Sequence, residues 1–319
     1  MKSVLFILPY FGKFPNYFQL FLNSCNANPT IDWLLVTDNS MNEFYLPANV
    51  IIKRSSFKDI QQLIFKRFQT NIIAPYELCK YRVAYIDLFL EAHSYDFWGY
   101  CDCDLIWGNL RIFLTEDILQ NYDKISWRGH MTLFKNSPNI NSAYKIKIPG
   151  FKTFKGCIEN TEGINLFDEV GINKIFDYLG LKIYKSIPFA DLKIRSANFK
   201  CLHNIFPQET NQLQIFSWSN ERGLERIYLL KGQIKKEAIA YVHFLKRPME
   251  MKGEDLKCSF LIIPNGFIDN RIITIKEIKK YARKKIYWSY WLHRINYTFI
   301  RNKINYLLHN KNNQPDKYC

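Results

Sequence analysis

The sequence lacks any uncharged apolar run of the roughly 18 to 20 residues that a helix needs to cross a bilayer, which argues against a membrane-spanning protein. Its first residues contain a short apolar burst, but Pro9 and Gly12 interrupt it and no small-residue cleavage site follows. We therefore interpret this start as a first β-strand rather than a signal peptide, and we expect a cytoplasmic protein.

Two other kinds of motif are also missing. The eight cysteines include no CxxC pair, and Cys101-x-Cys103 has no second pair at zinc-site spacing, so we expect buried thiols in a reducing compartment rather than a zinc site or a disulfide framework. Neither GxGxxG nor GxxxxGK[ST] occurs. A phosphorylated ligand would therefore need another means of neutralisation, and a metal ion held by carboxylates is the obvious candidate.

The sequence has fewer acidic than basic residues: 29 Asp and Glu against 44 Lys and Arg, which gives a net charge of +15. The excess is uneven: residues 276–319 contain eleven Lys and Arg against Glu277 and Asp316, a net charge of +9. This shift in composition predicts a domain over residues 1–275 and a basic, amphipathic helical tail over residues 276–319.

Apolar runs alternate with amphipathic segments along the predicted domain. We expect strands at 4–8, 33–36, 97–101, 125–127, 182–189, 226–230, 238–244 and 259–263, and helices at 17–22, 60–68 and 78–92. This alternation predicts an α/β fold with a Rossmann-type, mostly parallel sheet and helices on both of its faces.

An acidic pair, Asp102 and Asp104, follows the aromatic strand predicted at 97–101. Side chains two residues apart on an extended strand end point to the same side, so both carboxylates could hold a hard divalent cation that also binds the phosphates of a nucleotide. Ligands of doubly wound sheets bind beyond the carboxyl ends of the strands, which is where this pair falls. The alternative is a pair of solvated turn aspartates.

The sequence also resembles the bacterial GT-A-type glycosyltransferase family of capsule and lipopolysaccharide biosynthesis, formerly described as a domain of unknown function. The matching segments are ILPYFGKFPNYFQLFLNSC at 7–25, WLLVTDN at 33–39, YELCKYRVAYIDLF at 76–89, YDFWGYCDCDLIWGNLR at 95–111, RGHMTLFKN at 128–136, FDE at 167–169 and YVHFLKRPM at 241–249. In one departure, Lys80 follows Cys79 where the family usually has an acidic residue, so the role of that acid does not carry over.

The resemblance implies a GT-A-like, hexosyltransferase-like enzyme that uses Mn²⁺ or Mg²⁺ held by Asp102, Asp104 and His243. Its donor would be a nucleotide-sugar, with a UDP-sugar as the leading candidate, and its acceptor a saccharide that a lipid could carry. The expected donor-binding residues are Tyr10, Phe11, Asp38, Arg82, Asp102 and Lys246.

Each implied role has an ordinary structural alternative. Asp38 would accept the ring N–H of uracil between Tyr10 and Phe11, or it simply caps the turn that it begins. Arg82 would meet the diphosphate, since guanidinium suits phosphate geometry, or it is a surface helix charge. His243 would complete the metal site, with Lys246 or Arg247 screening the departing diphosphate, or it is a structural histidine at a strand end.

Asp168 and Glu169 are the candidates for acid–base chemistry. An inverting enzyme would use one of them to deprotonate the acceptor hydroxyl, and a retaining enzyme would use it to steady the positive sugar ring. Alternatively they occupy a helix N-terminus, where the dipole favours acidic residues. Arg128 and His130 are assigned to the acceptor side.

The basic tail would lie on an anionic membrane surface at the inner face of the cell membrane, or would pack its apolar face on the domain. Two other functions stay open. One is a metal-dependent nucleotidyltransferase that makes nucleotide-sugars, and the other a non-catalytic basic module that binds membrane or nucleic acid. Nucleic acid is not an expected partner, because the basic charge is confined to one terminal stretch and no nucleic-acid motif occurs.

Overall fold

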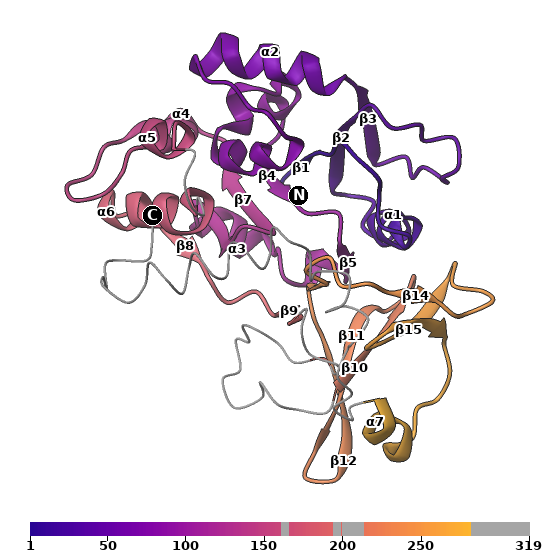
Figure 1. Ribbon diagram of the computed structural model, residues 1–319. Coiled ribbons are helices and arrows are strands. Elements are labelled where there is room, and N and C mark those ends of the chain that lie inside the picture. Colours follow the sequence, from indigo (N-terminus) through magenta and orange to yellow (C-terminus); the bar gives the residue numbers. More distant parts are fainter. Residues whose placement is uncertain (161–165, 194–198, 200–213, 282–319) are drawn as a thin grey trace, which may run out of the picture.

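A computed structural model of the chain describes residues 1–160, 166–193, 199 and 214–281 (Figure 1). Its main sheet has seven strands in the order β3-β2-β1-β4-β7-β6-β8. These strands are β1 (Val4–Pro9), β2 (Asp32–Thr37), β3 (Val50–Arg54), β4 (Phe97–Cys101), β6 (Lys124–Arg128), β7 (Met131–Lys135) and β8 (Ile183–Tyr184). β7 runs antiparallel to both of its neighbours, whereas the other adjacent pairs are parallel. The predicted α/β class with a mostly parallel sheet is confirmed.

Helical segments cover both faces of this sheet. They are α1 (Phe18–Asn26), α2 (Phe57–Phe68), α3 (Glu116–Asn121), α4 (Pro138–Ser142), α5 (Phe154–Ile158), α6 (Ile172–Tyr178), the 3₁₀ segments η1 (Pro75–Asp87), η2 (Leu90–Ser94), η3 (Leu110–Ile112) and η4 (Ala143–Lys145), and the π-helical turn η5 (Phe167–Gly171). Leu5 and Ile7 of β1 pack toward α2, η1 and α6, whereas Val4, Phe6 and Leu8 pack toward α1 and α3. This period of two is what a strand buried on both sides requires.

Two predicted elements differ in detail. The helix expected at 78–92 is replaced by η1 and η2, because η1 buries the consecutive run Val83–Ile86 rather than one face of a 3.6-residue helix. The strand expected at 182–189 is divided into β8 and β9 (Phe189–Asp191). Pro188 separates these two strands, and proline has no N–H to donate to a sheet ladder.

A small sheet in the order β5-β13-β9 connects segments that are far apart in the sequence. It consists of β5 (Leu105–Trp107), β9 and the central strand β13 (Tyr241–His243). β13 is antiparallel to β5 and parallel to β9, so His243 is paired with Leu105 on one side and with Asp191 on the other. This pairing brings three distant stretches of chain to one place.

The second large sheet has the order β12-β11-β10-β15-β16-β14 and is antiparallel except for the parallel pair β14–β16 (Figure 1). Its strands are β10 (Gln214–Ser219), β11 (Gly223–Leu230), β12 (Gln233–Ala238), β14 (Glu250–Met251), β15 (Ser259–Ile263) and β16 (Gly266–Asp269). The sequence predicted two of these strands but not the sheet. Helix α7 (Ile275–Tyr281) packs on it through the fully buried Ile278, which contacts the cluster containing Ile215 and Ile227.

The predicted boundary at residue 275 falls at the start of α7. Residues 282–319, which make up most of the predicted tail, lie outside the described residues, so the division into a domain and a tail stays a prediction. Within the described part of the chain, no helix is both long enough and apolar enough to span a membrane.

Gly99 lies in β4, where any side chain would collide with β7. A Cβ atom at this position would overlap the carbonyl oxygen of Thr132 and lie 2.9 Å from Cα of Leu133. Because both are backbone atoms inside a sheet, we expect Gly99→Ala to lower the free energy of unfolding by about 3 kcal/mol in chemical denaturation. The control is Gly156→Ala, since the atom nearest to its added Cβ is 3.4 Å away. Equal losses in the two variants would contradict this account.

Candidate active site

Asp102 and Asp104 come directly after β4, at the carboxyl ends of the parallel strands β1, β2 and β4. Nε2 of His243 lies 3.4 Å from Oδ1 of Asp104 and 3.7 Å from Oδ2 of Asp102. The structure therefore brings together the three residues predicted as metal ligands, with donor atoms within 4.8 Å of one another. We call Asp102, Asp104 and His243 the carboxylate–histidine cluster.

The backbone around the cluster fixes its geometry. Leu105, which follows Asp104, is paired with His243 across β5 and β13. The amide N–H of Lys246 donates to Oδ2 of Asp104 over 2.6 Å. Leu245 and Lys246 have φ angles of 51° and 56°, a left-handed conformation that is unfavourable for residues with a Cβ. A strained turn after β13 thus directs an amide at the Asp104 carboxylate.

Burial and the attraction between neighbouring groups together set the charge of the cluster, in which Asp104 is 5% exposed and His243 is 3% exposed. Burial opposes protonation of His243, but the carboxylate of Asp104 prevails and raises the pKa of His243 to about 10. Burial likewise opposes ionisation of Asp104, yet His243 holds the pKa of Asp104 below its ordinary value. The pKa of Asp102 is raised by burial and by Asp104, against the opposing charge of Arg82.

The donor set fits a hard or borderline divalent cation, because carboxylate oxygens and an imidazole nitrogen are accepted ligands of Mn²⁺ and similar ions. A cation there would neutralise the buried carboxylate of Asp104 and the half-buried carboxylate of Asp102, and would take the place of the Nε2 proton of His243. These residues therefore fit the predicted metal.

Two further residues surround His243 on its other side. Nδ1 of His243 and Oδ1 of Asp191 are 2.8 Å apart, and the ring of His130 stacks on that of His243 with 4.4 Å between centroids. The sequence assigned His130 to the acceptor side and did not predict Asp191. The available signal for Asp191 was its position after the apolar residues Phe189 and Ala190, which repeats the pattern of Asp102 after β4.

Arg82 of η1 links the cluster to a second group of acids. Its guanidinium forms an ion pair with Asp102, forms another with Asp168 at 3.3 Å, and donates to the carbonyl oxygen of Gly129 over 2.6 Å. Arg82 also lies 5.5 Å from the centre of the Tyr100 ring. One cation therefore compensates two carboxylates. The expected contact between Arg82 and a diphosphate stays a prediction.

Asp168 and Glu169 occupy the π-helical turn η5, an irregularity that occurs often at functional sites. Glu169 accepts a hydrogen bond from the N–H of Gly129 over 2.7 Å and lies 3.5 Å from the guanidinium of Arg128. Burial, reinforced by Glu169 and opposed by Arg82, raises the pKa of Asp168 to about 6. A carboxyl group that titrates near neutrality suits proton transfer.

An irregular stretch of β6 shapes the wall beside these acids. Its register shifts between Ile125 and Arg128, and Ser126 has a φ of 70°. Bulges of this kind often redirect side chains next to active sites, and here the guanidinium of Arg128 lies 3.5 Å from the centre of the Trp127 ring. Lys124, the first residue of β6, is fully buried, and this burial lowers its pKa to about 7.

The residues assigned to the nucleotide follow β1 and β2. The Tyr10 hydroxyl donates to the carbonyl of Lys13 over 2.9 Å, and burial together with Cys103 raises the pKa of Tyr10. Phe11 packs against Phe57, and Asp38 is exposed after β2. No hydrogen bond or ion pair within the described ranges joins Phe11 or Asp38 to the carboxylate–histidine cluster, so their contact with a base stays a prediction.

The two basic residues after His243 differ in environment. Lys246 is exposed, and its ammonium lies 4.7 Å from the centre of the Tyr76 ring. Arg247 is 2% exposed, and its Nε donates to the carbonyl of Pro264 over 2.6 Å. Lys246 is therefore the residue available to a ligand, whereas Arg247 supports the second large sheet.

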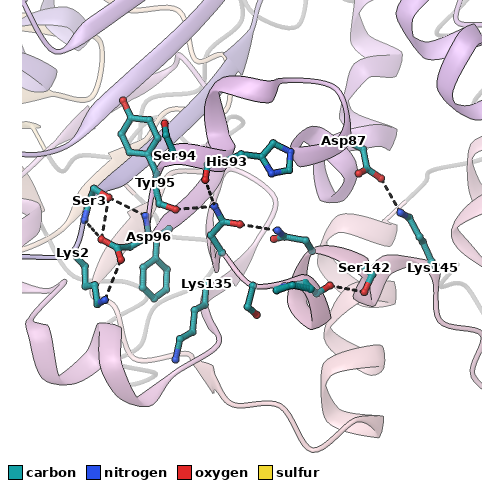
Figure 2. Close-up of a pocket in the computed structure, with 15 residues that line it drawn as sticks. Lys2, Ser3, Asp87, His93, Ser94, Tyr95, Asp96, Lys135, Ser142 and Lys145 are labelled. Atoms are coloured by element: carbon teal, nitrogen blue, oxygen red, sulfur yellow. Dashed lines mark hydrogen bonds and ion pairs between the residues drawn. The ribbon is translucent and has the colours of Figure 1, made fainter.

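A polar cavity of about 740 Å³ lies elsewhere, at the amino-terminal ends of β1 and β4 (Figure 2). Charged residues that line this cavity form ion pairs with one another: Lys2 pairs with Asp96 at 3.0 Å, and Lys145 pairs with Asp87 at 3.0 Å. Figure 2 also shows Lys135 directed away from these pairs. Since ligands of such sheets bind at the carboxyl ends of the strands, the carboxylate–histidine cluster is the candidate active site.

Comparison with known proteins places the chain in a family. The profile of a family of unknown function (DUF6625) matches residues 6–271, which include every residue of the cluster. The chain belongs to DUF6625. No curated protein has significant sequence similarity to it.

Among solved structures, this DUF6625 chain is similar to the glycosyltransferase GlyE of Streptococcus pneumoniae TIGR4, with 13% sequence identity and a TM-score of 0.31. The match covers 58% of this chain and 44% of the GlyE chain, so the chain corresponds to less than half of that protein. A likeness this weak supports no assignment of residues or activity.

Asp168 should destabilise the protein above its folded-state pKa. The folded carboxyl titrates at about 6 against an ordinary value of 3.8, so between these pH values the unfolded chain binds fewer protons and the wild-type protein loses stability as pH rises. We expect Asp168→Asn to raise the free energy of unfolding at pH 8 by up to about 3 kcal/mol. The gain should shrink as the pH approaches 4 in denaturant titrations. An equal gain at pH 4.5 and pH 8 would rule out this explanation.

Proposed function

We propose that this protein is a metal-dependent glycosyltransferase that moves a sugar from a nucleotide-sugar to a surface polysaccharide acceptor. A UDP-sugar is the leading donor, and a capsule or lipopolysaccharide chain is the leading acceptor. The observation that carries the proposal is the largely buried carboxylate–histidine cluster at the carboxyl ends of a mostly parallel sheet. The ordered motifs that resemble GT-A-type glycosyltransferases support it independently.

Asp102, Asp104 and His243 would hold Mn²⁺ or Mg²⁺. When bound, the ion would neutralise the diphosphate and stabilise its departure as the glycosidic bond to the donor breaks. Lys246 is exposed beside the cluster and would add positive charge to the same leaving group. Tyr10 follows β1 near Cys103 and Asp104, where its ring would flank the nucleotide base.

Asp168 and Glu169 would serve the acceptor. Arg82 connects Asp168 with Asp102, so acid–base chemistry and donor binding would share one ion-pair network. Asp168 would accept the proton of the acceptor hydroxyl above about pH 6, the pH at which its folded carboxyl ionises. Glu169 is held by Gly129 and Arg128 and would fix the position of this turn.

The predicted tail would bring the enzyme to a lipid-linked acceptor. Its excess of nine positive charges and its interspersed aromatic residues are typical of helices that lie on anionic leaflets. This would make the enzyme a cytoplasmic protein peripheral to the inner face of the cell membrane. Because Ile278 is buried in α7, a truncation that tests the tail should begin after Tyr281.

Donor screening tests the proposed activity. Full-length protein is incubated with a panel of nucleotide-sugars, with Mn²⁺ or with EDTA, and nucleotide release is measured. We expect Mn²⁺-dependent release that Asp104→Asn lowers at least about 100-fold, because the variant keeps the shape but loses the charge that holds the metal. Asp117→Asn, an exposed change on α3, is the control and should retain activity.

A parallel reaction that contains a nucleoside triphosphate and a sugar phosphate discriminates between enzyme classes. Release of pyrophosphate from a nucleoside triphosphate and a sugar phosphate would replace the proposal with nucleotidyl transfer. Full activity of Asp104→Asn at saturating donor would remove Asp104 from the metal site.

Charge reversal in the tail tests the membrane proposal in the full chain. We expect Lys284→Glu with Arg294→Glu to weaken binding to anionic vesicles about 30-fold or more at low salt, because each basic residue near the leaflet contributes about 1 kcal/mol. The control is Lys58→Glu with Lys147→Glu, two exposed lysines of the domain. Co-sedimentation with vesicles measures both, and equal retention of the two variants would contradict a specific role of the tail.

A further inference from the structure

We propose that Asp191 is a positioning residue that orients His243, so that Nε2 of the imidazole faces Asp102 and Asp104. This inference rests on the proposed function, because it assumes that the carboxylate–histidine cluster holds a divalent cation. It adds a residue that the sequence did not predict as part of the site.

Strand pairing creates the contact. Asp191 ends β9, His243 ends β13, and the two residues are direct partners in the parallel pairing of these strands. Side chains at partner positions project from the same face of a sheet, which leaves them within reach of each other. Nδ1 of His243 and Oδ1 of Asp191 are 2.8 Å apart, a normal hydrogen-bond distance.

This hydrogen bond determines which ring nitrogen is left for the metal. With Nδ1 occupied by Asp191, Nε2 is the nitrogen that lies 3.4 Å from Asp104 and 3.7 Å from Asp102. A histidine ligand commonly donates its second N–H to a carboxylate, which fixes the tautomer and the ring orientation. The Asp191–His243–cluster arrangement has this pattern.

His130 limits the remaining freedom of the ring. Its imidazole stacks on that of His243, and its Nε2 lies 4.0 Å from Oδ2 of Asp191. Asp191, His130 and His243 are at most 6% exposed, so little water competes for these contacts. His130, Asp191 and His243 could also be viewed as a second metal-binding group. The close Nδ1 contact favours a supporting role instead, because it uses the nitrogen that such a site would require.

Two substitutions separate orientation from charge. Asp191→Ala removes the acceptor, whereas Asp191→Asn keeps a carbonyl oxygen in nearly the same position. We expect Asp191→Ala to weaken Mn²⁺ binding about 10- to 100-fold and Asp191→Asn to weaken it less, as is typical for the partners of metal-bound histidines. The matched control is Asp87→Asn, which removes a carboxylate that pairs with Lys145 and Arg67 at the cavity of Figure 2.

The measurements use full-length protein without a nucleotide. Electron paramagnetic resonance of free Mn²⁺ gives the dissociation constant, and ¹⁵N chemical shifts of the labelled His243 ring report protonation and hydrogen bonding at each nitrogen. We expect the Nδ1 signal to shift in Asp191→Ala and to stay unchanged in Asp87→Asn. A role confined to stability would lower the melting temperature but leave the affinity of the folded protein unchanged.

The outcomes distinguish this inference from the proposed function. If the wild type binds Mn²⁺ and both Asp191 variants bind it equally well, the positioning role is wrong and the metal site stands. If the wild type binds no Mn²⁺ while nucleotide-sugar turnover persists, both the metal role and the positioning role are wrong. If Asp191→Ala does not fold, the test rests on Asp191→Asn alone. An unchanged Mn²⁺ affinity and an unchanged His243 Nδ1 signal in Asp191→Asn then overturn the inference.

Discussion

The central position of β13 is the constraint on which the candidate site depends. This three-residue strand pairs with β5, which follows the acidic pair, and with β9, which ends in Asp191. Without it, His243 would have no fixed relation to Asp102 and Asp104, which precede it by more than a hundred residues. Asp102 and Asp104 lie at the carboxyl ends of the main sheet, and β13 supplies His243, which lies close to both carboxylates.

Burying so many ionisable groups is costly unless each has a partner. The site meets this requirement with two connected sets of contacts. His243 compensates Asp104 and Asp191, while Arg82 compensates Asp102 and Asp168. The raised pKa of Asp168 shows that compensation is incomplete there. Functional sites commonly give up stability in this way, because a fully neutralised carboxyl would have little tendency to accept a proton.

The sequence predicted the parts of the fold that have strong local signals. Continuous apolar runs identified β1, β2 and β4, and the turn signals after them located Tyr10, Asp38 and the acidic pair. Two strands of the second large sheet, β11 and β15, were predicted, but the sheet was not. β12 has no buried residue and β14 is only two residues long, so neither has a clear strand signal, and the pairing of the six strands is long-range. η1 was mistaken for an α-helix, since burial on several sides hides the period of a 3₁₀ segment.

The residues of the site were only partly predictable for a related reason. Asp102 and Asp104 could be chosen from their spacing at a strand end, and His243 because the family resemblance implies a late histidine at the metal site. Asp191 also follows apolar residues, but its contact with His243 depends on a parallel pairing between β9 and β13 that no local pattern encodes. Long-range strand register is therefore the information that the sequence alone did not supply.

The strained turn at Leu245 and Lys246 also bears on which cation the cluster can select. Oδ2 of Asp104 accepts a hydrogen bond from the amide of Lys246, and Oδ1 of Asp102 forms an ion pair with Arg82, so these contacts favour binding of a cation through the other oxygen of each carboxylate. With His243, the protein then supplies three donor atoms, one of them nitrogen. Ca²⁺ takes six to eight oxygen ligands and often binds carboxylates through both oxygens, whereas smaller cations accept a few protein donors and fill the rest with water or phosphate oxygens. In the proposed site, binding of each carboxylate through one oxygen would therefore disfavour calcium and would leave coordination positions for the phosphates of the proposed donor.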